Sequence, residues 1–362
     1  MNDLKFLNAF NSIPGVGPAT LRTLKKNFGT YEEAWVADET TLFRAGVNQI
    51  SLRAISWKRA TLHPDKEMEK LVTGGVWLVA EDDKNYPALL REIPNAPVAL
   101  YGRGDLNTLA EETLKIAVVG TRRPTHYGLE ACEKIVTGLA DARIIIVSGL
   151  ASGIDARAHE AALDMQGKTI AVLGSGIDHN SIFPPENRGL ARRIAESRGA
   201  VISEYTPGTP ALKEHFPQRN RIISGLSRVV LVVEAREKSG ALITARFALE
   251  QNRDVFAIPG SVFSPTSLGP HRLIQEGAKL VTSTGDILEE LGIEYTKEKG
   301  GGLNGLPEDE RLLLAFLVEP VGVDYLKEKT HLDTAQIIAS LSMLELKGIV
   351  KNFGGNTYQK TG

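Results

Sequence analysis

The chain has 362 residues, of which 42% are hydrophobic and 24% are charged, and its formal net charge is -2. This composition is typical of a globular protein with two or three domains, each large enough to bury its own core. The longest apolar runs are far shorter than the roughly 20 residues of a membrane span, and the first residues lack the order of a signal peptide. We therefore expect a cytoplasmic protein without a membrane partner.

Cys132 is the single cysteine, so an internal disulfide is excluded, and no group of Cys and His residues has the spacing of a zinc site. We expect neither a metal nor a cofactor. The net charge does not exclude a nucleic-acid partner, because a total says nothing about clustering. Residues 213–228 alone carry a charge of +3, which leaves -5 for the rest of the chain.

Residues 1–70 predict a small helical domain of the helix-hairpin-helix or SAM-like type. The sequence IPGVGP at 13–18 forms an apolar-glycine hairpin, and the helix expected after it carries Arg22, Lys25 and Lys26. Glycines in such a hairpin let backbone N–H groups approach a phosphate at a helix start. A plain helical turn remains the alternative interpretation.

Residues 71–296 predict a doubly wound, mostly parallel, Rossmann-like α/β domain. Two short strands at 76–83 and 97–105 lead into it. Apolar runs rich in β-branched residues then alternate with helical stretches, which indicates a parallel sheet covered on both faces. These runs lie at 115–120, 143–149, 168–174, 199–205, 228–235, 254–260 and 278–283.

The composition changes near residue 300. Residues 297–306 are rich in glycine and predict a flexible linker. Residues 307–362 contain three amphipathic helices and a hairpin with a Gly-Gly turn, the pattern of a winged helix-turn-helix domain. Its expected recognition helix, 334–347, offers Lys347 as its one basic residue, so we favour a protein-contact or spacer role over DNA reading.

Motifs for catalysis are weak. Gly167-Lys168-Thr169 ends a helix and opens a strand, the reverse of the order in a P-loop, and residues 174–179 match the dinucleotide fingerprint incompletely. Asp155 and His159 lie four apart at a helix start and share one face, which suits an acid/base pair or two metal ligands. The structural alternative is that Asp155 orders the turn through backbone N–H groups while His159 packs beside it.

Glycine and hydroxyl-bearing residues follow several of the predicted strands. Such turns expose N–H and O–H donors, and helix starts add a positive field, so they suit phosphate binding. Several turns together predict a surface long enough for consecutive phosphates. The candidate residues are Gly120, Thr121 and Arg122; Ser148, Gly149, Ser152 and Gly153; and Ser239, Gly240 and Thr244.

The segment KEHFPQRNRIISGLS at 213–227 places Lys213, Arg219 and Arg221 around Phe216. Proteins that hold single-stranded nucleic acid combine a positive surface with aromatic rings on which bases stack. We therefore expect Phe216 to stack on a base and the three cations to neutralise phosphates. The alternative is that Phe216 fills the core beside the strand at 228–235.

Much of the chain matches a known family. The sequence resembles the bacterial DNA-processing protein A family, also called DprA or Smf. The joint order and spacing of its motifs make the resemblance specific. The matching motifs are VVGTRRPTHYG (118–128), SGLASGIDARAHEAAL (148–163), AVLGSGID (171–178), IFPPENR (182–188), SEY (203–205), HFPQRNRIISGLS (215–227), VVEAREKSGALITARFALEQNRDVFAIPGS (232–261) and GPHRLIQEGAKLV (269–281).

The resemblance implies a homodimer through the Rossmann-like domain that binds single-stranded DNA and helps to load RecA recombinase during natural transformation. It implies a mediator, not an enzyme. Thr121 replaces a serine that is common in the family and keeps the hydroxyl. The family's DNA-binding residues fall on Arg122, Lys213, Phe216, Arg219, Asn220 and Arg221, and less closely on Arg188.

A second hypothesis is an enzyme on a similar sheet, a nucleotide phosphoribohydrolase. Those enzymes carry a Pro-Gly-Gly-x-Gly-Thr loop, whereas this chain has Pro259-Gly260-Ser261 at the comparable strand end. The departure favours the DNA-binding hypothesis. Release of a free base from nucleotides, abolished by Asp155→Asn, would support the enzyme.

Overall fold

The computed structural model describes residues 2–293, 306–346 and 348–360. Its contacts divide the chain into two compact units, Met1–Ile293 and Glu294–Gly362. Most of the predicted linker 297–306 lies outside the described residues. No described helix is long and apolar enough to cross a membrane.

The N-terminal part of the first unit is helical, as predicted. Its caps follow the sequence: the side chains of Thr30, Asp38 and Asn48 each accept a hydrogen bond from the N–H three residues later. Pro18 occupies the first position of its helix, directly after the predicted hairpin. The helices are α1 (Asn2–Asn11), α2 (Pro18–Phe28), α3 (Tyr31–Val36), α4 (Glu39–Arg44), α5 (Gln49–Arg59) and α6 (Pro64–Thr73).

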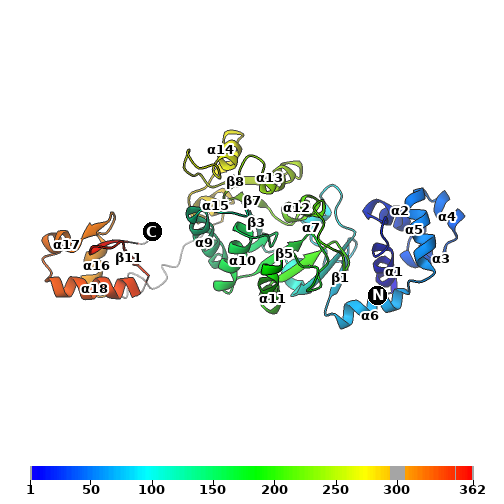
Figure 1. The fold of residues 1–362 in the computed structure, drawn as a ribbon, viewed down its shortest axis with the longest axis horizontal. Coiled ribbons are helices and arrows are strands. Elements are labelled where there is room, and N and C mark those ends of the chain that lie inside the picture. The colour runs from blue at the N-terminus through cyan, green and yellow to red at the C-terminus, as the bar shows by residue number, and fades with distance from the viewer. Residues whose placement is uncertain (1, 294–305, 347, 361–362) are drawn as a thin grey trace. The chain divides into compact units, whose positions relative to one another are not determined.

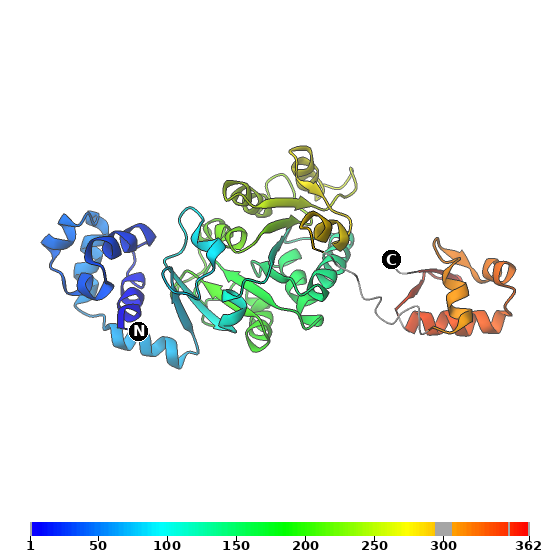
Figure 2. The same cartoon turned by 180° about the vertical axis from the view of Figure 1, so that it is seen from behind.

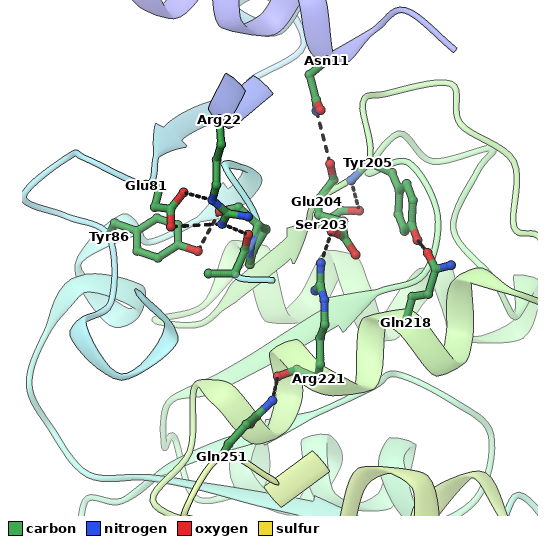
Figure 3. A network of polar contacts seen from close by, with 12 residues as sticks. Asn11, Arg22, Glu81, Tyr86, Ser203, Glu204, Tyr205, Gln218, Arg221 and Gln251 are labelled. Atoms are coloured by element: carbon green, nitrogen blue, oxygen red, sulfur yellow. Dashed lines mark hydrogen bonds and ion pairs between the residues drawn. The ribbon is translucent and has the colours of Figure 1, made fainter. Parts of the chain in front are cut away.

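These helices share a hydrophobic core with the sheet domain. Phe10, Ile13 and Leu21 belong to the same cluster as Tyr101 of the sheet. Polar contacts join the same parts (Figure 3): the Arg22 guanidinium lies 3.1 Å from a carboxylate oxygen of the sheet domain, Glu81 Oε1, and the Asn11 amide donates to the Glu204 carbonyl. Arg22 and Lys25, carried by the helix after the predicted hairpin, are both in ion pairs, Lys25 with Asp3 at 2.7 Å.

The sheet of the first unit runs in the order β1-β2-β6-β5-β4-β3-β7-β8-β9. From β6 to β9 all neighbours are parallel, whereas β1 and β2 extend the sheet antiparallel beyond β6. The predicted doubly wound sheet is confirmed. The strands are β1 (Trp77–Ala80), β2 (Ala99–Gly104), β3 (Lys115–Val119), β4 (Ile145–Ser148), β5 (Thr169–Leu173), β6 (Ala200–Ser203), β7 (Val229–Val232), β8 (Asp254–Ala257) and β9 (Lys279–Leu280).

Helices pack on both faces of this sheet, as Figures 1 and 2 show from opposite sides. Most buried residues of β3 to β7 are apolar, on both faces, because each face carries a helical layer. The helices are α7 (Ala88–Arg91), α8 (Leu106–Ala110), α9 (His126–Asp141), α10 (Ile154–Asp164), the 3-10 turn η1 (Pro185–Asn187), α11 (Arg188–Glu196), α12 (His215–Gly225), α13 (Gly240–Glu250), α14 (Leu268–Gln275) and α15 (Thr284–Glu290).

The strand order reverses beside β3. After β3 the chain builds outward through β4, β5 and β6, and it then returns to pair β7 with the other side of β3. The loops that follow β3 and β7 therefore leave adjacent strands and turn to opposite faces. Thr121 N–H donates to the Glu234 carbonyl at 2.7 Å, which ties the two loops together. In open α/β sheets this switch point is where ligands bind.

The second unit confirms the predicted winged helix. Its three-stranded sheet has the order β10-β12-β11 and closes over a core that includes Leu313, Leu326 and Leu341. The elements are α16 (Glu308–Leu314), β10 (Val321–Gly322), α17 (Val323–Thr330), α18 (Thr334–Leu346), β11 (Val350–Asn352) and β12 (Thr357–Lys360). Lys347, the basic residue expected at the end of the recognition helix, lies outside the described residues.

Candidate nucleic-acid interface

A pocket of about 780 Å³ opens at the strand switch point. We call it the strand-end pocket. Its walls are the loop after β3, the loop after β7, the start of α13, and the first turns of α12 with the segment before it. The lining residues are Val119, Gly120, Thr121, Arg122, Ala151, Asp155, Phe183, Ala211, Lys213, Phe216, Pro217, Arg219, Asn220, Ile223, Arg236, Lys238, Ser239, Gly240, Ala241, Ile243 and Thr244.

Four exposed cations surround the strand-end pocket: Arg122, Lys213, Arg236 and Lys238. They come from three different loops. Within the described ranges none of the four forms an ion pair, whereas Lys168, Arg221 and Arg253 of the same domain do. Asp155 is the one acid among the described lining residues. The rim therefore carries uncompensated positive charge, which favours a polyanionic ligand.

Two phenylalanine rings lie in the same pocket. The Arg122 guanidinium lies over the Phe216 ring, 5.5 Å from its centroid, and Phe183 approaches Phe216 at 5.7 Å between centroids. Phe216 is partly exposed and not a core plug, while Phe183 is 43% exposed. The rings give the pocket an apolar surface between cations, with the larger free area on Phe183.

Arg219 forms the floor of the pocket. It was expected as an exposed cation beside a phosphate, but its side chain lies inside the domain. Its side chain is buried, with 4% exposure. Nη1 donates to the Gly149 and Val172 carbonyls, and Nε donates to the Asn220 side chain at 3.2 Å. Burial lowers its pKa to about 10, against the opposing field of Asp155. Arg219 therefore holds strand ends in place and does not project as a free phosphate clamp.

Asp155 orders its turn and His159 packs in the core, as in the structural alternative to an acid/base pair. Asp155 accepts the Gly149 N–H at 3.0 Å, and burial raises the pKa of its carboxyl while Arg219 lowers it. His159 is fully buried, its Nδ1 lies 2.7 Å from Thr169 Oγ1, and burial lowers its pKa to about 3. The two side chains thus serve different neighbours. Among the described residues no three His, Cys, Asp or Glu side chains form a metal site.

Ten of the sixteen predicted site residues line the strand-end pocket. They are Gly120, Thr121, Arg122, Lys213, Phe216, Arg219, Asn220, Ser239, Gly240 and Thr244. Gly149 and Ser152 line a small adjoining cavity that Arg122, Phe183 and Phe216 share. Asn220 donates to the Gly240 carbonyl at 3.2 Å, so it ties α12 to the start of α13.

The other four predicted residues are elsewhere. Arg221 pairs with Glu204 at 2.6 Å, on the side of α12 that faces the helical part of the unit (Figure 3). Arg188 donates to the Asn180 and Ile182 carbonyls and braces that loop. Ser148 is buried and donates to the Val118 carbonyl. Gly153 packs against the loop after β3. Both guanidinium groups thus have partners within the chain, and the expected phosphate contacts of Arg188 and Arg221 stay a prediction.

Sequence reasoning missed Arg236, Lys238 and Phe183. Arg236 and Lys238 directly follow the predicted strand at 228–235, so their place at a strand end was readable from the sequence. Phe183 lies in the IFPPENR motif, and no local pattern indicates that its ring meets Phe216. That contact depends on how the loop before η1 folds across the sheet.

Comparison with known proteins decides the family. A family model described as DNA recombination-mediator protein A matches residues 77–292, more than half of the chain. The chain belongs to this family. A second family model, described as the DprA winged helix domain, matches residues 303–356. The resemblance to DprA and Smf proteins is thus confirmed, and the chain has a role in DNA processing and recombination mediation.

Three proteins of the DprA family are similar to this chain over most of their own length. Protein Smf of Synechocystis sp. is 36% identical over 97% of this chain and 97% of its own. The crystal structure of DNA processing protein A from Streptococcus pneumoniae has a TM-score of 0.70 and 37% identity, covering 80% of this chain and 98% of that one. The Helicobacter pylori protein, whose structure concerns its single-stranded DNA binding mode, has a TM-score of 0.54 and 31% identity, covering 60% and 95%.

Proposed function

We propose that this chain binds single-stranded DNA in the strand-end pocket and acts as a recombination mediator. The observation that carries the proposal is the combination of two partly exposed rings, Phe183 and Phe216, with four unpaired cations in one pocket. Duplex DNA keeps its base faces stacked, whereas unpaired bases can lie on such rings. Each base stacked on an aromatic ring contributes about 1 to 3 kcal/mol with little sequence preference.

Each part of the pocket has a role in this proposal. Arg122, Lys213, Arg236 and Lys238 neutralise phosphates along the rim, and Phe183 and Phe216 contact bases. The N–H groups at the start of α13, which Ser239 caps, add a positive field. Arg219 and Asp155 act indirectly by fixing the loops. A relative from Helicobacter pylori binds single-stranded DNA, which supports the same ligand here.

A salt series tests the proposal. Equal-length single-stranded and duplex oligonucleotides are titrated at several salt concentrations with wild type, Lys213→Ala and Lys238→Ala. Neutralising one phosphate of a single strand contributes about 0.7 to the slope of log affinity against log salt, so each variant should lower the slope by roughly that amount. Lys134→Ala removes an exposed lysine of α9 that lines none of these sites and serves as the control. Unchanged affinity and slope in both pocket variants would refute the proposal.

The mediator role extends to a recombinase. We propose that the bound strand is handed to RecA during natural transformation, and that the Rossmann-like domain forms a homodimer. An exposed apolar loop supports a protein contact: Val262 is 72% and Phe263 is 93% exposed. Sedimentation should show a dimer that Phe263→Glu dissociates. RecA filament assembly on single strands covered by a binding protein should accelerate with wild type and not with Lys213→Ala.

A further inference from the structure

A second cavity lies on the other side of the segment that carries Lys213 and Phe216. It measures about 360 Å³, and we call it the hairpin cavity. Its lining comes from the helical part and the sheet part of the first unit. The lining residues are 11–18, Leu21, 97–99, 204–206, Thr209, Leu212 and His215.

One ridge separates the two cavities. Ala211, Lys213 and Phe216 face the strand-end pocket, while Leu212 and His215 face the hairpin cavity. Neighbouring residues of the chain are about 3.8 Å apart between Cα atoms, so His215 and Phe216 place the two cavities within one residue of each other. A strand that contacts Phe216 therefore passes the mouth of the hairpin cavity when it crosses the ridge.

The hairpin cavity suits a flat, uncharged group. Tyr205 and His215 both line it and stack on each other, at 4.1 Å between centroids with 19° between planes, so the lining contains an aromatic pair. Glu204 is the one charged residue among the described lining residues, and its carboxylate is paired with Arg221 at 2.6 Å (Figure 3). The cavity thus lacks the free cations that a phosphate needs and offers apolar and aromatic surface.

Polar atoms of this lining lack partners. His215 Nδ1 and Glu204 Oε1 are buried without a hydrogen bond, and the whole Glu204 side chain is only 10% exposed. Buried polar atoms in proteins are almost always hydrogen-bonded, so unpaired ones beside a cavity point to a missing partner. The edge of a nucleobase carries N–H donors and ring acceptors, whereas an aliphatic side chain carries neither.

We propose that the hairpin cavity takes a second unpaired base of the strand held in the strand-end pocket. This inference rests on the proposed function. The base lies between the hairpin at 13–18 and the Tyr205 and His215 rings, and its phosphates stay on the cationic side of the ridge. The helical part of the unit then contributes to DNA binding through a base contact, while Arg22 and Lys25 remain in their ion pairs.

Two measurements on the full chain test this inference. Leu212 is 41% exposed, so Leu212→Trp fills the cavity from its mouth without changing charge. Loss of one stacked base should weaken binding of a 20-nucleotide thymidine oligomer about 5- to 150-fold. The salt slope should stay unchanged because no phosphate contact is lost. Leu249→Trp, at a 60% exposed leucine of α13 outside both cavities, is the matched control and should bind like wild type.

The second measurement uses wild type, so it does not depend on a variant that folds. Oligomers with one photoreactive 5-iodouracil per molecule should crosslink to Tyr205 or His215 from one position and to Phe183 or Phe216 from a nearby position. Crosslinks confined to Phe183 and Phe216, or wild-type affinity in Leu212→Trp, would overturn the inference while leaving the proposed function intact. If the proposed function itself is wrong, Lys213→Ala will bind single-stranded DNA with the affinity and salt slope of the wild type.

Discussion

Replacing Arg219 by methionine removes the buried cation from the floor of the strand-end pocket. In the wild type this guanidinium donates to the Gly149 and Val172 carbonyls and to the Asn220 side chain. Burial raises the pKa of Asp155, and the field of Arg219 opposes that rise. Removing one member of a buried, hydrogen-bonded charge network costs about 3 to 5 kcal/mol, because the remaining charge stays buried without compensation. We expect the free energy of unfolding to fall by that amount at pH 7.

Urea denaturation followed by tryptophan fluorescence measures this loss. Trp35, Trp57 and Trp77 all lie in the first unit, so the signal does not depend on the winged helix. Arg246→Met is the control: this arginine is 82% exposed in its side chain and pairs only with Glu250 along one helix turn, so its loss should stay within about 0.5 kcal/mol.

A second variant separates the charge effect from lost packing. In the Arg219→Met background, Asp155→Asn removes the uncompensated carboxylate, so it should cost less there than in wild type. Residues of one network couple by about 0.5 to 3 kcal/mol, which is the expected difference. A loss below about 1 kcal/mol for Arg219→Met, or an equal cost of Asp155→Asn in both backgrounds, would refute the structural role of Arg219.

Two further predictions concern the same loops. Burial lowers the pKa of His159 to about 3 from its ordinary 6.5, so its contribution to stability is present above pH 6.5 and is lost as pH falls toward 3. Between pH 7 and pH 5 the free energy of unfolding of the wild type, measured by urea denaturation, should fall by about 2 kcal/mol from this cause, and His159→Gln should lack that part of the loss. The same pH dependence in both proteins would contradict the buried, neutral state of His159. Gly153 has φ +84°, and a Cβ there would lie 2.5 Å from the Thr121 carbonyl and 2.8 Å from Arg122. Gly153→Ala should therefore lower the free energy of unfolding by more than about 1 kcal/mol and weaken single-strand binding by displacing Arg122. Gly189 has open space around it, so Gly189→Ala should do neither. Wild-type affinity and stability of Gly153→Ala would contradict the prediction.

The fold was largely readable from the sequence because its signals are local. Each apolar run between 115 and 260 became a parallel strand near its predicted bounds, since a run that is apolar on both faces has to lie between two helical layers. The run at 278–283 gave only the two-residue strand β9, because it lies at the edge of the sheet and both residues are exposed. The antiparallel places of β1 and β2 depend on the pairing of β2 with β6 and of β1 with β2, which no local pattern specifies.

The site was only partly readable, because the sequence shows which residues are basic but not which of them are exposed and unpaired in the folded chain. Residues 213–228 look like a basic cluster, yet Arg219 is buried and Arg221 is paired with Glu204. Lys213 is the one member of that predicted clamp that remains exposed and unpaired in the described structure. The other free cations of the pocket, Arg122, Arg236 and Lys238, come from the loops after β3 and after β7.

By itself, the sequence determined the α/β alternation, the turns at the strand ends, the winged helix and the family. These depend on residue periodicity and on motifs that are continuous in the chain. Tertiary structure decided which cations stay free, that Phe183 meets Phe216, and that the hairpin at 13–18 lines one cavity together with Tyr205 and His215. Such contacts join residues far apart in the chain, and their geometry exists only once the strands are aligned and the helices are packed.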